Sequence, residues 1–165
     1  MSDRGVVAVT LPGESAATLR RRLANGRSSA QLSSRRTALL ERALRQIREY
    51  FRGRRTRFDL PLDLRVPPFQ HGVLRVLSRV PFGATVSYGA LAKALGAPRA
   101  ARAVGAALAR NPVPIVLGCH RVLAGDGSIG GFAGASHDLA TKRALLRHEG
   151  VAPRGDVARR RKLSP

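Results

Sequence analysis

The proline pair Pro67-Pro68 places the strongest constraint on how this chain can fold. Each proline disfavours helical backbone in the residue before it, so no regular helix is expected to run through this point. The hydrophobic pattern also changes here, from mixed strand and helix signals to mainly helical periodicity. We therefore expect two folded units that meet near residue 66.

Residues 34–51 carry the clearest helix signal of the first unit. Apolar residues recur at spacings of four, three and four, as in an amphipathic helix that buries one face. They are Leu40, Leu44, Ile47 and Phe51. Gly53 is a suitable stop signal, because glycine readily adopts the left-handed backbone that ends many helices.

Two strand signals flank this helix. Residues 5–11 predict a short strand that ends at Pro12-Gly13, and residues 58–64 show a period-two alternation. Pro61 restricts the second strand to the edge of a sheet, since proline cannot donate to a strand ladder. Residues 1–66 are therefore predicted to form a small α/β domain, consisting of a short sheet plus a helix.

Residues 67–150 predict a mostly helical second domain, so the fold class of the whole chain is α/β. Apolar spacing indicates one helix over residues 69–80 and a last helix over residues 138–148. Between them, helices over residues 88–95 and 99–110 are joined by a tight Gly-Ala-Pro connection, a spacing typical of a helix-turn-helix.

The single cysteine, Cys119, follows a predicted short buried strand over residues 113–117. His120 lies beside it, but a lone cysteine is usually a small buried apolar residue, so the pair carries little weight by itself. One cysteine excludes an intrachain disulfide and a thiolate-rich zinc site, and no metal site is expected.

Charge points to a polyanionic partner. The chain has 30 Lys plus Arg against 10 Asp plus Glu, a formal net charge of +20, and no acidic residue lies between Asp63 and Asp126. Residues 151–165 have no hydrophobic pattern and predict a disordered basic tail that adds nonspecific phosphate contacts or is inert. Genome bias towards arginine is the alternative explanation of the overall charge.

The sequence contains no apolar run long enough to span a bilayer, and no charged-then-apolar leader follows Met1. We therefore expect a soluble cytoplasmic protein without a membrane partner, a location compatible with the nucleoid. No pattern indicates oligomerisation, so a monomer is expected.

The predicted helix over residues 99–110 has an unusual surface of small side chains. Such a face can press closely into a groove, and the scarcity of Asn, Gln and Ser at its start favours insertion into the minor groove of DNA. Tight packing against another helix is the alternative explanation. The predicted DNA-contacting residues are Arg99, Ala100, Ala101, Arg102, Ala103 and Gly105.

Five segments together resemble, in order and spacing, the O6-alkylguanine-DNA alkyltransferases, also called methylated-DNA-protein-cysteine methyltransferases. The resemblance covers roughly residues 69–150, and over residues 1–66 it is only architectural. The segments are Val86-Ser-Tyr-Gly-Ala-Leu-Ala, Ala100-Ala-Arg-Ala-Val-Gly105, Asn111-Pro-Val-Pro-Ile, Cys119-His-Arg-Val and Lys142-Arg-Ala-Leu-Leu-Arg-His-Glu-Gly150.

The resemblance implies direct-reversal DNA repair without a cofactor. The alkyl group on O6 of a flipped-out alkylguanine in double-stranded DNA would pass irreversibly to Cys119, once per chain. O4 of alkylthymine is a second candidate position. The arginine at the position of Arg102 would fill the gap that the flipped nucleotide leaves.

The resemblance also implies roles for the residues around the cysteine. His120 would take the thiol proton through a water molecule and Glu149 would orient the histidine, while Tyr88 would stabilise the departing guanine and Asn111 would brace the active-site turn. The guanine would be held by the carbonyls of Cys119 and Val122, the amide of Ala133 and the ring of Phe132.

The chain departs from the family pattern at Gly118, where proline is usual, at Phe132, where tyrosine is common, and at residues 135–138. Gly118 is expected to loosen the turn before the cysteine. Two other classes stay open: a nonenzymatic protein that recognises alkylguanine, and a helix-turn-helix DNA-binding protein with an incidental thiol. Cys119 argues against the first, because such relatives lack the cysteine.

Overall fold

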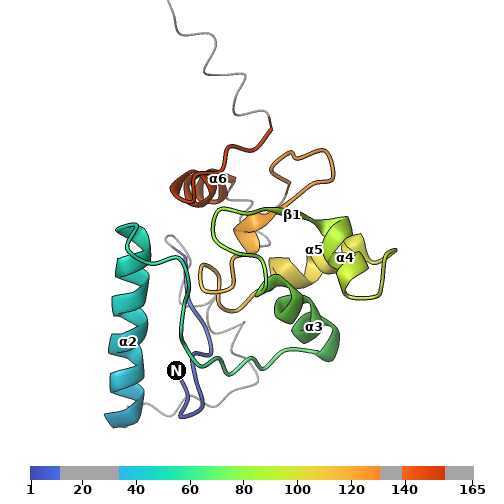
Figure 1. Cartoon of the computed structure of the whole chain (residues 1–165). Coiled ribbons are helices and arrows are strands. Elements are labelled where there is room, and N and C mark those ends of the chain that lie inside the picture. The colour runs from blue at the N-terminus through green and yellow to red at the C-terminus, as the bar shows by residue number, and fades with distance from the viewer. Residues whose placement is uncertain (12–33, 131–138, 155–165) are drawn as a thin grey trace, which may run out of the picture. The chain divides into compact units, whose positions relative to one another are not determined.

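A computed structural model describes residues 1–11, 34–130 and 139–154 of this mixed α/β protein (Figure 1). These residues fall into two compact units. One lies within Met1–Pro67 and Pro112–Val116, and the other within Pro68–Asn111 and Leu117–Pro165. Among the described helices, none has both the length and the apolar character to cross a membrane.

The first unit is built on the helix α2 (Ser34–Phe51), which has the predicted bounds. Gly53 ends it with φ 69°, and its amide donates to the Tyr50 carbonyl at 2.9 Å. A left-handed residue after the last turn satisfies carbonyls that the helix leaves open.

The buried face of α2 differs from the predicted stripe. Leu44 and Phe51 are 43% and 50% exposed, whereas Gln46 and Tyr50 are buried. Gln46 exchanges two hydrogen bonds with the backbone of Asp59, at 3.0 and 2.9 Å, and Tyr50 packs near Phe58 with ring centroids 5.5 Å apart. The segment that follows α2 thus selects a face that α2's own apolar spacing does not predict.

The two segments predicted as strands do pair in parallel, but among the residues described for this unit the pairing is a single bridge between Val6 and Leu62 rather than a sheet. The Val6 amide donates to the Pro61 carbonyl at 2.8 Å, and the Asp63 amide donates to the Val6 carbonyl at 3.0 Å. Pro61 has no N–H, so the ladder cannot continue through it. A Cβ on Gly5 would lie 2.6 Å from the Pro61 oxygen, which shows how closely the two segments approach.

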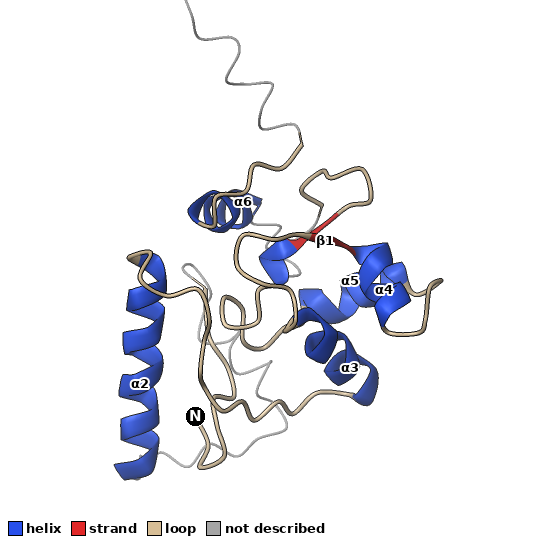
Figure 2. Ribbon diagram, viewed as in Figure 1, coloured by secondary structure: helices blue, strands red, loops and turns tan. Residues whose placement is uncertain are grey.

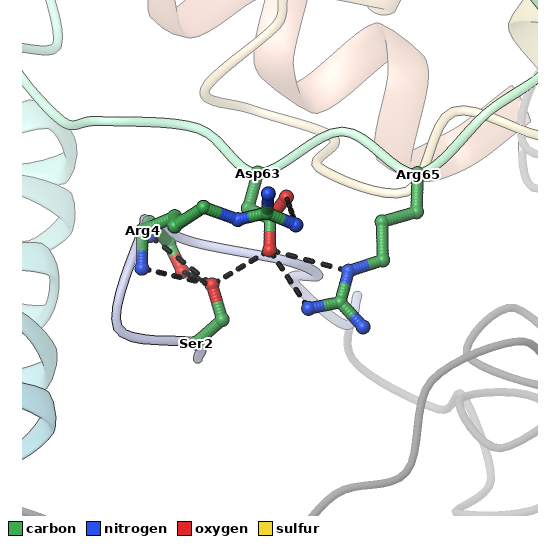
Figure 3. Close-up of polar contacts among 5 residues, drawn as sticks. Ser2, Arg4, Asp63 and Arg65 are labelled. Carbon is green, nitrogen blue, oxygen red and sulfur yellow. Dashed lines mark hydrogen bonds and ion pairs between the residues drawn. The ribbon is translucent and has the colours of Figure 1, made fainter.

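Polar side chains hold these segments together in place of a longer sheet (Figure 3). The Ser2 hydroxyl donates to Asp63 at 2.7 Å, Arg65 donates to the same carboxylate at 2.9 and 3.2 Å, and Arg4 lies 3.4 Å from it. The Ser2 hydrogen bond and the two arginines lower the pKa of Asp63 below its ordinary value, although burial opposes them.

The second unit contains the helices of the predicted helix-turn-helix, and Figure 2 shows them as neighbouring helices. These two helices are α4 (Tyr88–Ala94) and α5 (Ala101–Ala109), and α3 (Pro68–Leu77) packs against both of them. Ser87 caps α4, since its hydroxyl accepts from the Ala90 amide at 3.1 Å. Gln70 of α3 donates to the Ala107 and Arg110 carbonyls at 3.1 and 2.9 Å, which fixes the end of α5.

The strand predicted over residues 113–117 was wrong. The segment is largely buried, as expected, but it is a turn in which Ile115 has φ 72°. Pro112 and Pro114 remove two amide donors, and a left-handed residue is incompatible with extended backbone.

The observed strands lie elsewhere in the second unit. β1 (Val86–Ser87) pairs in parallel with β2 (Val122–Leu123), in the register Val86 to Val122 and Ser87 to Leu123. A short 3-10 helix, η1 (Cys119–Arg121), immediately precedes β2, and α6 (Leu139–His148) follows and packs on η1. The short strand therefore comes directly after the cysteine segment rather than before it.

Candidate active site

Cys119 is the first residue of η1 and is 6% exposed. Its amide donates to the Leu117 carbonyl at 2.7 Å, which makes a tight turn centred on Gly118. β2 begins three residues after Cys119, and α4 begins with Tyr88 directly after β1. The parallel pairing of β1 and β2 brings the start of α4 to the segment that carries Cys119, and the charge of the Cys119 thiolate acts on Tyr88, although 31 positions separate the two residues in the sequence.

His120 and Glu149 form a fully buried pair. Nε2 of His120 lies 2.8 Å from Oε1 of Glu149, and both side chains are 0% exposed. Nδ1 of His120 is buried and has no hydrogen-bond partner among the described residues. Burial lowers the pKa of His120, and the charges of Arg121 and Lys142 add to this, whereas Glu149 opposes it. The imidazole is therefore a neutral base with one nitrogen open.

The Glu149 carboxylate accepts from three parts of the unit. Oε1 accepts from His120 and from Nη2 of Arg121 at 3.0 Å, while Oε2 accepts from Nε of Arg121 at 2.9 Å and from the Gly83 amide at 3.1 Å. Burial tends to raise the pKa of Glu149, but the hydrogen bonds from His120 and Arg121 hold that pKa well below its ordinary value. Glu149 is thus a permanent anion in this site.

Tyr88 lies beside the cysteine and keeps its proton. Burial raises the pKa of Tyr88, and the nearby charge of the Cys119 thiolate raises it further. A Cβ on Gly105 would lie 3.8 Å from the Tyr88 ring, and one on Gly130 would lie 3.2 Å from it. Gly130 thus makes room for this ring, whereas a side chain at Gly105 would only touch it.

Lys142 of α6 is fully buried and belongs to the same site. Its Nζ donates to the Val122 carbonyl at 2.6 Å and lies 5.9 Å from the centroid of the Tyr88 ring. Burial lowers the pKa of Lys142 to about 8, against the opposing attraction of the Cys119 thiolate. The spacing of Lys142 from Leu145 and Leu146 puts it on the apolar stripe of α6, a sequence signal that indicates an unusual buried lysine.

Asn111 closes the loop before the cysteine. Its side-chain amide donates to the Leu117 carbonyl at 2.9 Å, so the ends of the intervening turn are held together. This places Asn111 where a brace for the active-site turn is expected.

The residues predicted to contact DNA divide into two groups. Arg99, Arg102 and Ala103 are exposed, whereas Ala100, Ala101 and Gly105 are partly covered, Gly105 by Tyr88. α5 begins at Ala101, so Arg99 and Ala100 precede the helix instead of belonging to it.

Two predicted pocket residues, Phe132 and Ala133, lie outside the described residues. Val122, the third, is buried in β2. Arg121 was not assigned a role from the sequence, because no local pattern distinguishes it from the other arginines.

Two family models match the chain. The model described as the DNA binding domain of 6-O-methylguanine DNA methyltransferase matches residues 68–151, and the model of its ribonuclease-like domain matches residues 2–64. The predicted family resemblance is therefore confirmed over residues 69–150, and the match to residues 2–64 goes beyond the architectural likeness expected of the first half.

Named relatives and solved structures agree with these models. A methylated-DNA-protein-cysteine methyltransferase of Mycolicibacterium paratuberculosis is 46% identical over 110 residues, which cover 67% of this chain and 67% of the relative. A constitutive enzyme of this name from Bacillus subtilis is 41% identical over 116 residues, 70% of this chain and 69% of the relative.

The crystal structure of Mycobacterium tuberculosis OGT in complex with DNA matches with a TM-score of 0.62 and 44% identity. The match covers 66% of this chain and 64% of that one. A crystal structure of O6-methylguanine methyltransferase from the same organism matches with the same TM-score, 42% identity, and 72% and 70% coverage. The chain belongs to the methylated-DNA-protein-cysteine methyltransferase family.

Proposed function

We propose that this chain repairs DNA by transferring the alkyl group from O6 of alkylguanine to Cys119. The observation that carries the proposal is the buried His120–Glu149 pair directly beside the single cysteine, with Nδ1 of the histidine open. A cysteine with an ordinary pKa is only a few per cent ionised at neutral pH, so a neighbouring base is needed to form the nucleophile.

In the first step, the Cys119 thiol loses its proton to Nδ1 of His120 through a bridging water molecule. The imidazolium that results is stabilised by Glu149, which is already ionised and lies 2.8 Å from Nε2. A base of lowered pKa accepts this proton only transiently, which suits a step in which the thiolate is consumed at once.

In the second step, the thiolate attacks the alkyl carbon. The bond from Sγ to carbon forms, the bond from carbon to O6 breaks, and the electron pair returns to the guanine ring. The Tyr88 hydroxyl, which keeps its proton because its pKa is raised, donates to the departing base. The guanine takes up the proton that the thiol lost, and its amino group donates to the carbonyls of Cys119 and Val122.

The product is a thioether, which has no polarised carbonyl for water to attack. Unlike an acyl-enzyme, it does not regenerate the thiol. We therefore propose one transfer per chain and no turnover, with O4 of alkylthymine as a second substrate position.

We further propose that α5 enters the minor groove of double-stranded DNA and that Arg102 occupies the gap left by the flipped nucleotide. The exposed Arg102 and Ala103 on a surface of small residues support this orientation. In this scheme residues 1–66 are the α/β domain, residues 67–150 bind DNA and accept the alkyl group, residues 151–165 add nonspecific phosphate contacts, and the chain acts as a monomer.

Intact-protein mass measurement tests the proposal. After incubation with a DNA duplex that contains O6-methylguanine, we expect the mass to rise by one methyl group on Cys119, and we expect no change in Cys119→Ala. In a parallel experiment the methyl group of the duplex carries a radioactive label. Retention of that label in the DNA, or removal of more than one methyl group per chain, would contradict the proposal. DNA binding without a mass shift would instead support a nonenzymatic alkylguanine-binding protein.

A further inference from the structure

The guanidinium of Arg121 is held by three hydrogen bonds within the site. Its Nε and Nη2 contact the two Glu149 oxygens at 2.9 and 3.0 Å, and its Nη1 donates to the Val80 carbonyl at 2.7 Å. The side chain is 9% exposed and Glu149 is 0% exposed. A planar guanidinium that grips a carboxylate with two parallel bonds fixes its orientation as well as its charge.

Gly118 provides the space that this guanidinium occupies. A Cβ on Gly118 would lie 2.8 Å from Nε, 2.9 Å from Cζ and 3.0 Å from Cδ of Arg121. The backbone of Gly118, with φ −66° and ψ 63°, is open to other residues, so conformational freedom does not explain the glycine. The missing side chain does, since any Cβ here would push on a buried and fully engaged arginine.

The pair of Arg121 and Glu149 also holds the turn that leads to Tyr88. Arg121 binds the Val80 carbonyl, and the Glu149 carboxylate accepts from the Gly83 amide. This turn runs directly into β1 and then into α4. Arg121 thus connects the histidine–carboxylate pair to the connection that positions the tyrosine.

We propose that Arg121 is a positioning residue of the alkyl transfer, which holds Glu149 against His120, and that in this chain its guanidinium fills the space that Gly118 leaves. The inference rests on the proposed function and assigns a role to two residues that touch neither thiol nor substrate in the scheme above. In this chain the Arg121 side chain fills the space that a side chain at position 118 would otherwise occupy.

The charges around His120 decide the expected sign. The charged groups that act on His120 are the carboxylate of Glu149, the guanidinium of Arg121 and the ammonium of Lys142, and Cys119 directly precedes it in η1. Of these, Arg121 and Lys142 disfavour the imidazolium and Glu149 favours it. Loss of the Arg121 charge leaves the buried carboxylate free to favour the imidazolium, so the pKa of His120 rises. The histidine is then protonated, and unable to act as a base, up to a higher pH.

Single-turnover kinetics provide the test, with protein in saturating excess over a duplex that contains O6-methylguanine. In Arg121→Gln we expect the acidic limb of the rate profile to move to higher pH and the rate constant near neutral pH to fall roughly tenfold or more, part of the ~10²–10⁴-fold that a positioned base contributes. Arg121→Lys keeps the charge without the two-point grip and should lie between this variant and the wild type. Arg75→Gln, at an exposed position of α3, is the control and should leave the profile unchanged.

NMR titration of the His120 ring in the unreacted protein gives a second readout that needs no alkyl transfer. We expect its titration midpoint in Arg121→Gln to lie above that of the wild type. An unchanged or lower midpoint, or a rate that falls by one factor at every pH, overturns the proposal. If the wild type accepts no alkyl group but the His120 midpoint still moves, the proposed function fails, while the coupling of Arg121 to His120 through Glu149 stands.

A double-substitution cycle tests the role of Gly118, and its Gly118→Ala arm in the wild-type background needs no change at Arg121. Gly118→Ala should slow the transfer in the wild type and should cost little in Arg121→Ala, where the space is empty. An equal cost in both backgrounds contradicts the steric link between the two residues.

Discussion

Lys142 is a buried, positively charged side chain, and burial makes its charged form unfavourable in the folded protein. The change in its pKa from 10.5 to about 8 costs the folded state about 3 kcal/mol below pH 8, at ~1.4 kcal/mol per pKa unit. Its hydrogen bond to the Val122 carbonyl offsets part of this cost. A fold that retains such a residue beside Cys119 gives up stability for a local positive charge.

Replacing this lysine should therefore stabilise the protein and slow it. In Lys142→Met we expect the free energy of unfolding near pH 7 to rise by about 1 kcal/mol, because the buried charge disappears while one carbonyl loses its donor. The unfolded lysine binds the proton more tightly than the folded one, so wild-type stability rises between pH 8 and 10.5 and the advantage of the variant shrinks there. Chemical denaturation of both proteins near pH 7 and again near pH 10 measures the difference in the free energy of unfolding.

Lys93→Met, at an exposed position of α4, is the matched control and should not change the stability in a pH-dependent way. A Lys142→Met protein that is less stable than wild type near neutral pH would show that the hydrogen bond outweighs the buried charge. Alkyl transfer should be slower in Lys142→Met, because the thiolate loses a nearby cation.

His120 and Glu149 should make the fold sensitive to acid. Both have a lowered pKa in the folded state, so the unfolded chain binds protons first as the pH falls. The stability that these groups contribute is present above the ordinary histidine value of 6.5 and is lost progressively below it, with a second loss below the ordinary glutamate value of 4.5. Denaturant midpoints should fall across this range, and below pH 4.5 the slope should be shallower in Glu149→Gln, which has no carboxylate to protonate. Equal slopes in the two proteins would refute the assignment.

The sequence predicts some of these residues and not others, for physical reasons. Cys119, His120, Glu149, Tyr88 and Asn111 occur in family-like segments, and the structure brings the first four into one site. Arg121 and Lys142 are buried cations, and their burial depends on partners 28 and 20 positions away in the sequence. The apolar spacing around Lys142 indicates its burial, but no local pattern identifies the partner of either cation, since an arginine or lysine is ordinarily exposed.

At the scale of elements, α2 shows which features local patterns determine. Its ends were predicted correctly, because periodicity and Gly53 are local signals. Its buried face was not, because Gln46 is held by the Asp59 backbone and Tyr50 by Phe58, and both contacts form only when the chain folds back. The mistaken strand over residues 113–117 has a similar origin. Apolar residues between prolines suit a buried strand or a buried turn equally well, and the left-handed Ile115 selects the turn.

The N-cap of α4 yields a prediction at this scale. α4 has only seven residues, so a large part of its backbone lies in its ends and depends on capping. Ser87→Ala removes the acceptor of the Ala90 amide and should lower the free energy of unfolding by about 1 kcal/mol. Ser78→Ala, an exposed serine after α3, is the control and should cost less. Equal losses in thermal unfolding would argue against a capping role.

At the scale of the molecule, the net charge of +20 should dominate affinity for DNA. Each phosphate that a basic residue neutralises releases a counterion, so log affinity should fall linearly with log salt, by about 0.9 for each phosphate contacted. Arg102→Ala should strongly reduce the rate of repair and leave the salt dependence of DNA affinity nearly unchanged, because the proposed role of Arg102 is to fill the gap in the duplex rather than to bind a phosphate. Arg52→Ala, exposed after α2, removes the same charge and should leave repair unchanged. Equal effects of the two substitutions on repair would contradict the role of Arg102.

The path of the chain between its two units limits how the molecule can be taken apart. The chain crosses from one unit to the other three times, after residues 67, 111 and 116, because Pro112–Val116 belongs with the N-terminal residues. A fragment that ends at residue 67 therefore contains an incomplete first unit, because residues 112–116 of that unit remain on the other fragment. Any chimera that exchanges the first unit between family members must therefore exchange residues 112–116 together with residues 1–67. A single crossover at residue 67 does not exchange a whole unit.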